Sequence, residues 1–381
     1  VPTKIGTSKP LTIDQERDDT GGLSLEELEA VTRHECSILS PLDAQQLAEG
    51  EADGWGGIWK VGAEDDGTLA NLRACDDLDI PLELLLAELV WSLSSFPNGT
   101  GLGWDRVHPK ALLRARMQWI EALLKLLVRC EAEGQWPEVI ELVIICLLPK
   151  PEGGFRPIGL LPVMPRVWMR ARRNTTQLWE RRNNRSYLYA GEGKGAQVAA
   201  WQQSARAEAA ARFKAAYAQG LLDLVKAFDS VPFRILVREA KRLGYSLRIL
   251  RLSLLTYTMP RSLRVGMVFS TLLLAMCGIT AGSGTACTEM RVLMIHVVDT
   301  AQVEYKHVIP TLYVDDLSAE ITASRQAVQD MRVGFLRLVC RMIEEMTMEV
   351  SRTKSVCTAC DPKLGRDIAA ELTEYGITYV D

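Results

Sequence analysis

Two adjacent carboxylates, Asp315 and Asp316, interrupt a mainly apolar stretch of this chain. Val308–Val314 precedes them and Leu317–Ile321 follows. These flanks predict the two strands of a β-hairpin, with the acidic pair at its bend. Charge beside buried apolar strands costs free energy unless it binds or pairs with something. The pattern therefore predicts a sheet that presents carboxylates at one edge.

A third carboxylate, Asp223, lies 92 residues upstream, at the end of another apolar run and before a helix expected over Val231–Leu243. If the two strands are neighbours, Asp223 can face Asp315. Carboxylates so placed can bridge two divalent ions about 3.5–4 Å apart. Mg²⁺ suits them because it prefers carboxylates, phosphate oxygens and water, and Mn²⁺ is the alternative. An isolated Asp pair is usually a turn or a cap, but here the apolar arms and the upstream Asp favour a phosphoryl-transfer site, typical of a nucleic-acid polymerase.

Charge is distributed unevenly along the 381 residues, although the net charge is only −4. Residues 1–90 carry 20 acidic and 6 basic side chains, whereas the remainder carries 28 acidic and 38 basic. This asymmetry predicts a basic nucleic-acid-binding body behind an acidic N-terminal connector. A solvated acidic surface explains the first 90 residues equally well.

Periodicity and turn residues outline further elements. Apolar residues at three- and four-residue steps predict helices over 109–132 and 325–350. Val139–Leu148 and Ile158–Val163 are expected to form a hairpin with Lys150 and Arg156 at its tip. Two arginine-rich stretches, 166–185 and 234–264, are expected to be helical.

Five segments, in order, resemble the reverse transcriptase domain of non-LTR (LINE-type) retrotransposons and, more distantly, group II intron maturases. Leu222–Val231 resembles the first palm motif of that family, and Tyr313–Asp316 resembles its catalytic hairpin. The other three are Asn98–Asp105, similar to the Gly-rich element before the fingers, Leu148–Ile158, similar to the fingers hairpin, and Val350–Ser355, similar to the motif after the palm helix.

The resemblance implies a role for each matching residue. Asp223, Asp315 and Asp316 would be the catalytic metal ligands, and Phe228 would lie under the sugar of a dNTP and exclude a 2′-hydroxyl. Lys150 and Arg156 would hold the triphosphate, and Lys354 would neutralise or protonate the leaving pyrophosphate. The alternative for Phe228 is a side chain of the protein core. For Lys150 and Arg156 it is a solvated hairpin tip, and for Lys354 it is a surface lysine.

The segment Cys277–Ala286 departs from the family pattern. Gly282 is retained and is expected to let the backbone approach template and nucleotide. Ala281 and Gly284 stand where the family carries Gln and Pro. The missing amide keeps open a second interpretation, in which the chain is a catalytically weak or inactive reverse-transcriptase-like RNA-binding protein from a decaying retroelement. An RNA-synthesising polymerase is a further alternative, which Phe228 disfavours.

Six arginines of the first basic stretch are expected to contact the nucleic-acid backbone without reading sequence. They are Arg166, Arg170, Arg172, Arg173, Arg181 and Arg182. Trp168 and Trp179, interleaved with them, suit either stacking on unpaired template or the protein core.

Together these features predict an α+β right-hand polymerase fold whose antiparallel palm sheet is backed by helices. Residues 1–90 would be the acidic connector, 91–215 the fingers and 216–381 the palm. The thumb would be absent or truncated, and other domains of a longer polyprotein would lie outside the chain. The expected function is RNA-directed DNA polymerase, with an RNA template, a DNA or RNA primer and dNTPs as partners.

The sequence also bears on location. No apolar run reaches the roughly 18 residues that cross a bilayer. The nine cysteines have no framework spacing, which is typical of a reducing compartment. We expect a nuclear or cytoplasmic protein with no membrane contact.

Overall fold

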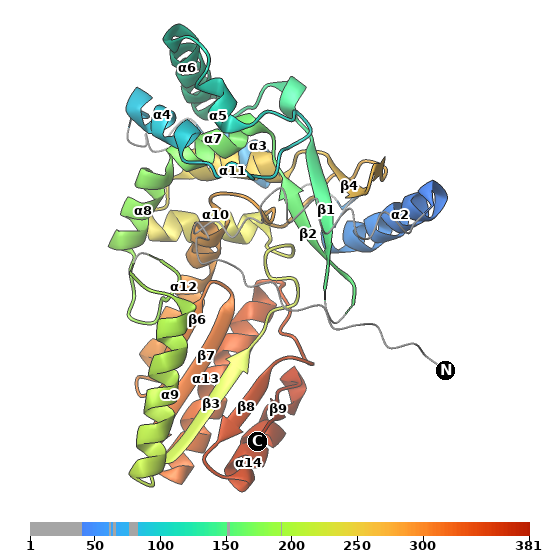
Figure 1. The fold of residues 1–381 in the computed structure, drawn as a ribbon. Coiled ribbons are helices and arrows are strands. Elements are labelled where there is room, and N and C mark those ends of the chain that lie inside the picture. The colour runs from blue at the N-terminus through green and yellow to red at the C-terminus, as the bar shows by residue number, and fades with distance from the viewer. Residues whose placement is uncertain (1–39, 61, 64–65, 76–82, 151–152, 192) are drawn as a thin grey trace.

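The computed structural model describes residues 40–381 apart from 61, 64–65, 76–82, 151–152 and 192. The chain forms a mixed α/β structure in which two small sheets are surrounded by helices (Figure 1). The helices are α2 Pro41–Ile58, α3 Thr68–Arg73, α4 Leu86–Ser94, α5 Pro109–Leu112, α6 Met117–Glu133, α7 Val163–Ala171, α8 Arg173–Arg182, α9 Ala196–Arg212, α10 Phe233–Leu243, α11 Leu247–Tyr257, α12 Ala286–Glu304, α13 Arg325–Glu345 and α14 Pro362–Glu371. The strands are β1 Val143–Pro149, β2 Phe155–Leu160, β3 Ala216–Leu222, β4 Arg261–Val265, β5 Val268–Phe269, β6 Ile309–Tyr313, β7 Asp316–Ala323, β8 Val356–Ala359 and β9 Thr378–Tyr379.

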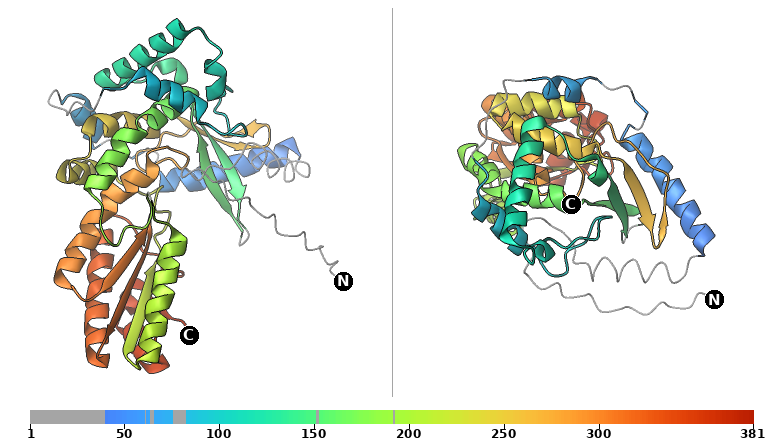
Figure 2. Two further views of the ribbon diagram at one scale, coloured as in Figure 1. Left: turned by 60° about the vertical axis from the view of Figure 1, so that its left-hand side comes forward. Right: turned by 90° about the horizontal axis from the view of Figure 1, so that it is seen from above.

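The N-terminal sheet has the strand order β2-β1-β4-β5. The expected hairpin of β1 and β2 is present, and β4 joins β1 in parallel. Strands β4 and β5 thus extend a sheet whose other strands precede them by more than 100 residues, although they lie within the range expected for the palm. Helix α2, in the range expected to be a connector, lies along this sheet (Figure 2).

The C-terminal sheet has the order β6-β7-β3-β8-β9. The first four strands are antiparallel, as expected, and β9 runs parallel to β8. Helices cover both faces. On one face, Gln203 and Arg206 of α9 bond to Ser318 and Glu320 of β7. On the other, a Cβ at Gly220 would collide with the guanidinium of Arg332 in α13.

Three expected helical stretches are shorter or broken. Arg116 has an extended backbone (φ −63°, ψ 148°), so the stretch 109–132 divides into α5 and α6. The basic stretch 234–264 holds two helices and a strand, because α10 ends at Gly244 (φ 62°), which favours a left-handed cap, and β4 begins at Arg261. The helix expected over 325–350 forms as α13 and ends at Glu345.

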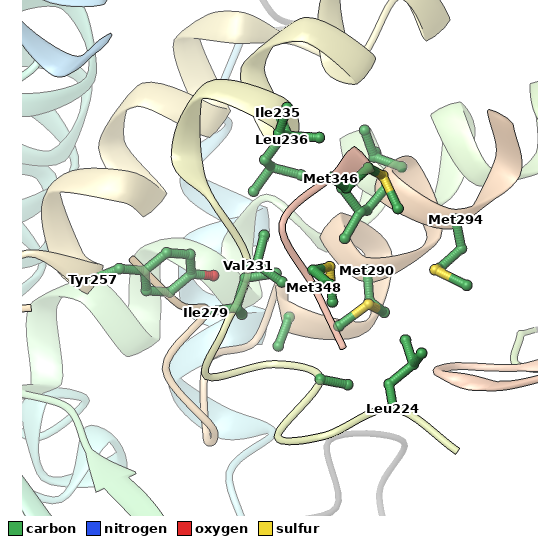
Figure 3. Packing of buried hydrophobic residues seen from close by; sticks show 14 of the residues in the cluster. Leu224, Val231, Ile235, Leu236, Tyr257, Ile279, Met290, Met294, Met346 and Met348 are labelled. Atoms are coloured by element: carbon green, nitrogen blue, oxygen red, sulfur yellow. The ribbon is translucent and has the colours of Figure 1, made fainter. Parts of the chain in front are cut away.

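A methionine-rich part of the core lies behind the loop that follows β3 (Figure 3). Met290 and Met294 of α12 and Met346 and Met348 after α13 pack around Leu224 and Val231, and all are buried. Flexible thioether side chains fill irregular gaps between several elements. This packing fixes the base of the loop that begins at Asp223.

Candidate active site

Asp223 is placed by the register of the C-terminal sheet. Leu222, the last residue of β3, pairs with Leu317 of β7, so Asp223 follows β3 at the end of the sheet where β7 begins at Asp316. The backbone of Asp223 is held by the loop before β8: its N–H donates to Ser355 Oγ (3.2 Å), and its carbonyl accepts from Ser351 N–H (2.7 Å). The segment resembling the motif after the palm helix therefore positions this carboxylate.

Asp315 and Asp316 lie at the bend of the β6–β7 hairpin, as expected. Tyr313 pairs with Asp316, which leaves Val314 and Asp315 as the two turn residues. Val314 has φ 59°, an uncommon conformation for a β-branched residue. Strain of this kind persists where the surrounding structure enforces it and often marks functional sites. The tight turn places Asp315 and Asp316 side by side at the end of the sheet where β3 also ends.

The three carboxylates affect one another. Burial, the charge of Asp316 and, more weakly, that of Asp223 raise the pKa of Asp315 to about 6. Burial and the charge of Asp223 raise the pKa of Asp316, which Lys354 opposes. Lys354 Nζ lies 3.8 Å from Asp223 Oδ2. Like charges are thus concentrated at one sheet edge, an arrangement that a cation would stabilise.

The donors at this edge fit a hard divalent cation, because they are carboxylate oxygens of the kind that Mg²⁺ and Mn²⁺ prefer. The carboxylates are not arranged as a complete metal-binding site. Within the described part of the chain, no group of three or more His, Cys, Asp or Glu side chains is close enough together to hold a metal ion. Two observations therefore bring Asp223, Asp315 and Asp316 together: the strand register, and the effect of their charges on one another's pKa values.

Cations from the N-terminal sheet reach the same place. The charge of Arg156 in β2 lowers the pKa of Asp315, more weakly than the other groups that act on this carboxyl, so Arg156 lies within electrostatic range of it. Lys150 begins the turn of that hairpin, where its N–H donates to the Gly154 carbonyl (3.0 Å). Of the two residues expected to bind a triphosphate, Arg156 thus acts on Asp315, whereas Lys150 acts on Lys226 and Asp229 in the loop after β3.

Lys226 is a charged residue to which the sequence analysis gave no role. Burial lowers its pKa, and the nearby charges of Lys150 and Lys354 lower it further. Its backbone has φ 48°, another conformation that is uncommon outside glycine. The only available sequence signal was a lysine between two carboxylates, Asp223 and Asp229, in one short loop.

Phe228 is half-buried in the loop after Asp223 and packs against the core. Its carbonyl accepts from Ile279 N–H (2.7 Å), and Gly278 N–H donates to the Val231 carbonyl (2.9 Å). The loop that departs from the family pattern is thereby bound to the loop carrying Asp223. These contacts leave the expected role of Phe228 toward the sugar as a prediction.

Gly282 has a structural explanation within the protein. It has φ +103°, and a Cβ there would lie 2.5 Å from the Gly159 carbonyl. Gly159 N–H in turn donates to the Ala281 carbonyl (2.7 Å). The close backbone approach at Gly282 is therefore to strand β2, and its expected approach to a template or nucleotide is untested.

The arginine-rich stretch requires a correction for the residues of α7 and the start of α8. Arg172 is 3% exposed and forms a buried ion pair with Glu131 (2.6 Å). Arg170 is buried and donates to the Ser95 carbonyl (2.8 Å). Arg166 donates to the Gly101 carbonyl and to Thr100 Oγ1, both at 2.7 Å, and burial lowers its pKa to about 10. Arg170 and Arg172 therefore organise the protein interior, because a buried guanidinium needs several acceptors, whereas Arg166 is half-buried and is bonded to the loop before α5.

The other three arginines of that set differ in exposure. Arg173 is half-buried, whereas Arg181 and Arg182 are exposed in the last turn of α8. Trp168 and Trp179 are buried, and their indole N–H groups donate to Glu131 and to the Leu243 carbonyl. The core interpretation of these tryptophans is confirmed.

No protein-family model matches the sequence, and no curated protein is similar to it. Among solved structures, apo telomerase from Candida tropicalis, truncated from its C-terminal domain, is similar with a TM-score of 0.44 and 13% identity. The match covers 59% of this chain and 51% of the telomerase chain, so the chain spans about half the length of that neighbour.

No helix in the described ranges combines the length and apolarity needed to span a bilayer.

Proposed function

We propose that this chain is a template-directed nucleic-acid polymerase of the reverse transcriptase type, which adds dNTPs to a primer 3′-end. The observation that carries the proposal is the register that brings the end of β3, which Asp223 follows, to the start of β7 at Asp316, next to Asp315, at one end of the five-stranded sheet. Three carboxylates, two of them with raised pKa values, suit a site that functions with divalent cations. In this assignment, the five-stranded sheet is the palm, and the β1–β2 hairpin belongs to the fingers.

Asp223, Asp315 and Asp316 would hold the Mg²⁺ or Mn²⁺ ions. Bound there, the ions would supply Lewis-acid activation of the primer hydroxyl and neutralise charge on the phosphates. The chain itself would position the nucleotide through Lys150, Arg156 and Lys354: the charge of Arg156 acts on Asp315, and Lys354 Nζ lies 3.8 Å from Asp223 Oδ2. Phosphoryl transfer depends on such positioning and charge neutralisation more than on covalent chemistry by the protein.

The finer assignment, RNA-directed DNA synthesis of the LINE type, is supported by the ordered motifs. Phe228 is the residue whose side chain would select the sugar. We expect Phe228→Ala to raise incorporation of NTPs relative to dNTPs, because a smaller side chain removes the collision with a 2′-hydroxyl. Unchanged sugar selectivity would exclude that role.

A second candidate is an RNA-binding protein of the same architecture without polymerase activity. Ala281 favours it, because its side chain offers no amide, and its carbonyl is bonded to Gly159 of β2. In this case the chain would keep Asp223, Asp315 and Asp316 but would not catalyse nucleotide addition.

Primer extension distinguishes these functions. The full chain would be offered a primed poly-rA template and a primed DNA template, with dNTPs and either Mg²⁺ or Mn²⁺. Extension on the RNA template that Asp223→Asn abolishes supports the proposal. Failure of the wild-type chain with both metals and both templates would leave the non-catalytic RNA-binding protein.

A further inference from the structure

Helix α2 forms one wall of the loop that follows Asp223. Trp59 Nε1 donates to Asp229 Oδ1 (3.0 Å), and Met276 N–H donates to the Trp59 carbonyl (2.9 Å). Cys277 Sγ donates to the Ile58 carbonyl (3.4 Å). The C-terminal end of α2 is therefore bonded to the loop that follows Asp223 and to the loop that contains Met276 and Cys277.

Two buried indoles line this wall. Trp55 and Trp59 are 4% and 1% exposed, and their ring centroids are 5.5 Å apart. Trp55 Nε1 donates to Glu51 Oε2 (3.2 Å) one turn earlier in the helix. Packing and hydrogen bonds together fix the orientation of the Trp55 ring.

Lys226 rests its ammonium group on that ring. Its Nζ lies 4.1 Å from the Trp55 ring centroid, within the range of a cation–π interaction. The Lys226 carbonyl accepts from Ser230 N–H (3.0 Å), and the residue is held at φ 48°. Both the backbone and the charged end of Lys226 are thus held in place, at a backbone conformation that an unconstrained lysine rarely adopts.

Lys226 lies three residues after Asp223, whose Oδ2 is 3.8 Å from the Nζ of Lys354. Lys150 comes from the β1–β2 tip, Lys354 from the loop before β8, and both repel the charge of Lys226 and so lower its pKa. Asp229 and Glu51 oppose this effect. Gathering like charges costs free energy, and an anion of high charge density placed between them would offset that cost.

We propose that helix α2 is a working part of the nucleotide site, and that Trp55 holds Lys226 as a third cation, alongside Lys150 and Lys354, for the phosphates of the incoming nucleotide. This inference rests on the proposed polymerase function and adds a phosphate-binding residue and its positioning residue. Lys226 binds substrate directly, whereas Trp55 acts through Lys226.

The chemistry of the three groups indicates a polyphosphate rather than a single carboxylate or phosphate. Lysine ammonium groups are compact point charges, each suited to a different phosphate oxygen. The opposing interpretation is that Lys226 merely covers the Trp55 ring and supports the α2 contact. That interpretation predicts effects on stability with none on nucleotide affinity.

The test compares Lys226→Asn with Lys226→Arg, and Trp55→Leu with Trp55→Phe, in the full chain. Asparagine tolerates positive φ and removes the charge, and arginine keeps it. Phenylalanine keeps an aromatic face for the cation, which leucine lacks. The matched control is Lys214→Asn, because Lys214 is exposed, has φ 51° and follows α9, outside the site.

Two measurements are made on each variant: KM and kcat for dNTP in primer extension, and the affinity for tripolyphosphate by calorimetry in the absence of primer. We expect Lys226→Asn to raise KM and weaken tripolyphosphate binding at least tenfold, and Trp55→Leu to do so about threefold. Lys226→Arg, Trp55→Phe and Lys214→Asn should stay within about twofold of wild type.

The inference is overturned if Lys226→Asn and Lys214→Asn give the same KM and the same tripolyphosphate affinity. If Lys226→Asn does not fold, equal affinities for Trp55→Leu and Trp55→Phe overturn it instead. A wild-type chain that binds tripolyphosphate through Lys226 but extends no primer would refute the polymerase function alone. The binding measurement therefore separates the two failures.

Discussion

Charged groups lie among apolar residues in two regions of this molecule, with opposite consequences. At the junction of α7 and α8, Arg172 is paired with Glu131 at 2.6 Å, and both side chains are almost completely buried. At the β6–β7 hairpin, Asp315 and Asp316 lie beside another carboxylate, Asp223, and burial and repulsion raise the pKa of Asp315 to about 6. A buried charge with a matched partner maintains structure, whereas gathered like charges are maintained for something that binds.

The largest expected effect is on activity at the hairpin. Asp223→Asn should reduce primer extension by about 1000-fold or more, because a metal-binding carboxylate is removed. The fold should be retained, and thermal stability should not fall, since one of three repelling charges is neutralised. Asp330→Asn, on the exposed side of α13, is the control and should extend primers normally. Extension by Asp223→Asn at wild-type rates would refute the catalytic assignment.

Where α7 meets α8, a substitution is expected to lower stability. Arg172→Ala should lower the free energy of unfolding by about 3–5 kcal/mol, because Glu131 remains buried without its cation. Denaturant unfolding measures this. Arg182→Ala, exposed at the end of α8, should change stability by less than about 0.5 kcal/mol. The double variant Arg172→Met with Glu131→Gln should recover most of the loss, because the new side-chain amide keeps an acceptor for the Trp168 indole.

Glu289 provides a third case, a buried carboxyl whose hydrogen-bond donor is a neutral hydroxyl. Burial raises its pKa to about 7, and the Tyr257 hydroxyl donates to it at 2.5 Å. Because the folded pKa is above the ordinary value of 4.5, the protonated form favours the folded state. Its contribution to stability is complete below about pH 4.5 and is lost as the pH rises through about 7.

Unfolding free energies at pH 5 and pH 8 test this case. The wild-type chain should lose about 2.5 kcal/mol more between these pH values than Glu289→Gln, which carries no titrating group there. Equal losses in both proteins would show that Glu289 is ionised in the folded state.

The smallest expected effect concerns nucleic-acid affinity. Arg182→Ala should reduce the slope of log affinity against log salt by about 0.7–0.9, as expected for one lost phosphate contact. The double variant of Arg172 and Glu131 should leave the slope unchanged. If substitution of Arg172 changed the salt slope and substitution of Arg182 did not, the buried arginine and not the exposed one would contact the nucleic acid, contrary to this account.

The carboxylate arrangement could be predicted from sequence because it depends on local order. An apolar run ending in Asp223 and two apolar arms around Asp315 and Asp316 specify strands, and adjacent antiparallel strands bring their ends together. The hairpin, the neighbouring strand β3 and the helix after it all formed as expected.

Which arginines of the basic stretch are buried and which are exposed could not be predicted in this way. Arg172 and Arg182 belong to one basic stretch, and only the tertiary position of Glu131, 41 residues before Arg172, separates a core ion pair from a surface charge. The parallel pairing of β1 with β4 was missed for the same reason, since it joins segments more than 100 residues apart. The contact of Trp55 and Trp59 with the loop after Asp223 was also missed. Both residues lie in a region whose composition indicated only an acidic connector.

The most direct test of the carboxylate site is Mn²⁺ binding, measured by electron paramagnetic resonance on wild type, Asp223→Asn, Asp315→Asn and Asp330→Asn. We predict that the wild-type chain binds Mn²⁺, that Mg²⁺ displaces it, and that Asp223→Asn and Asp315→Asn each weaken binding at least about tenfold while Asp330→Asn does not. Identical titrations for all four proteins would contradict the claim that the carboxylates of two separate strands form one cation site.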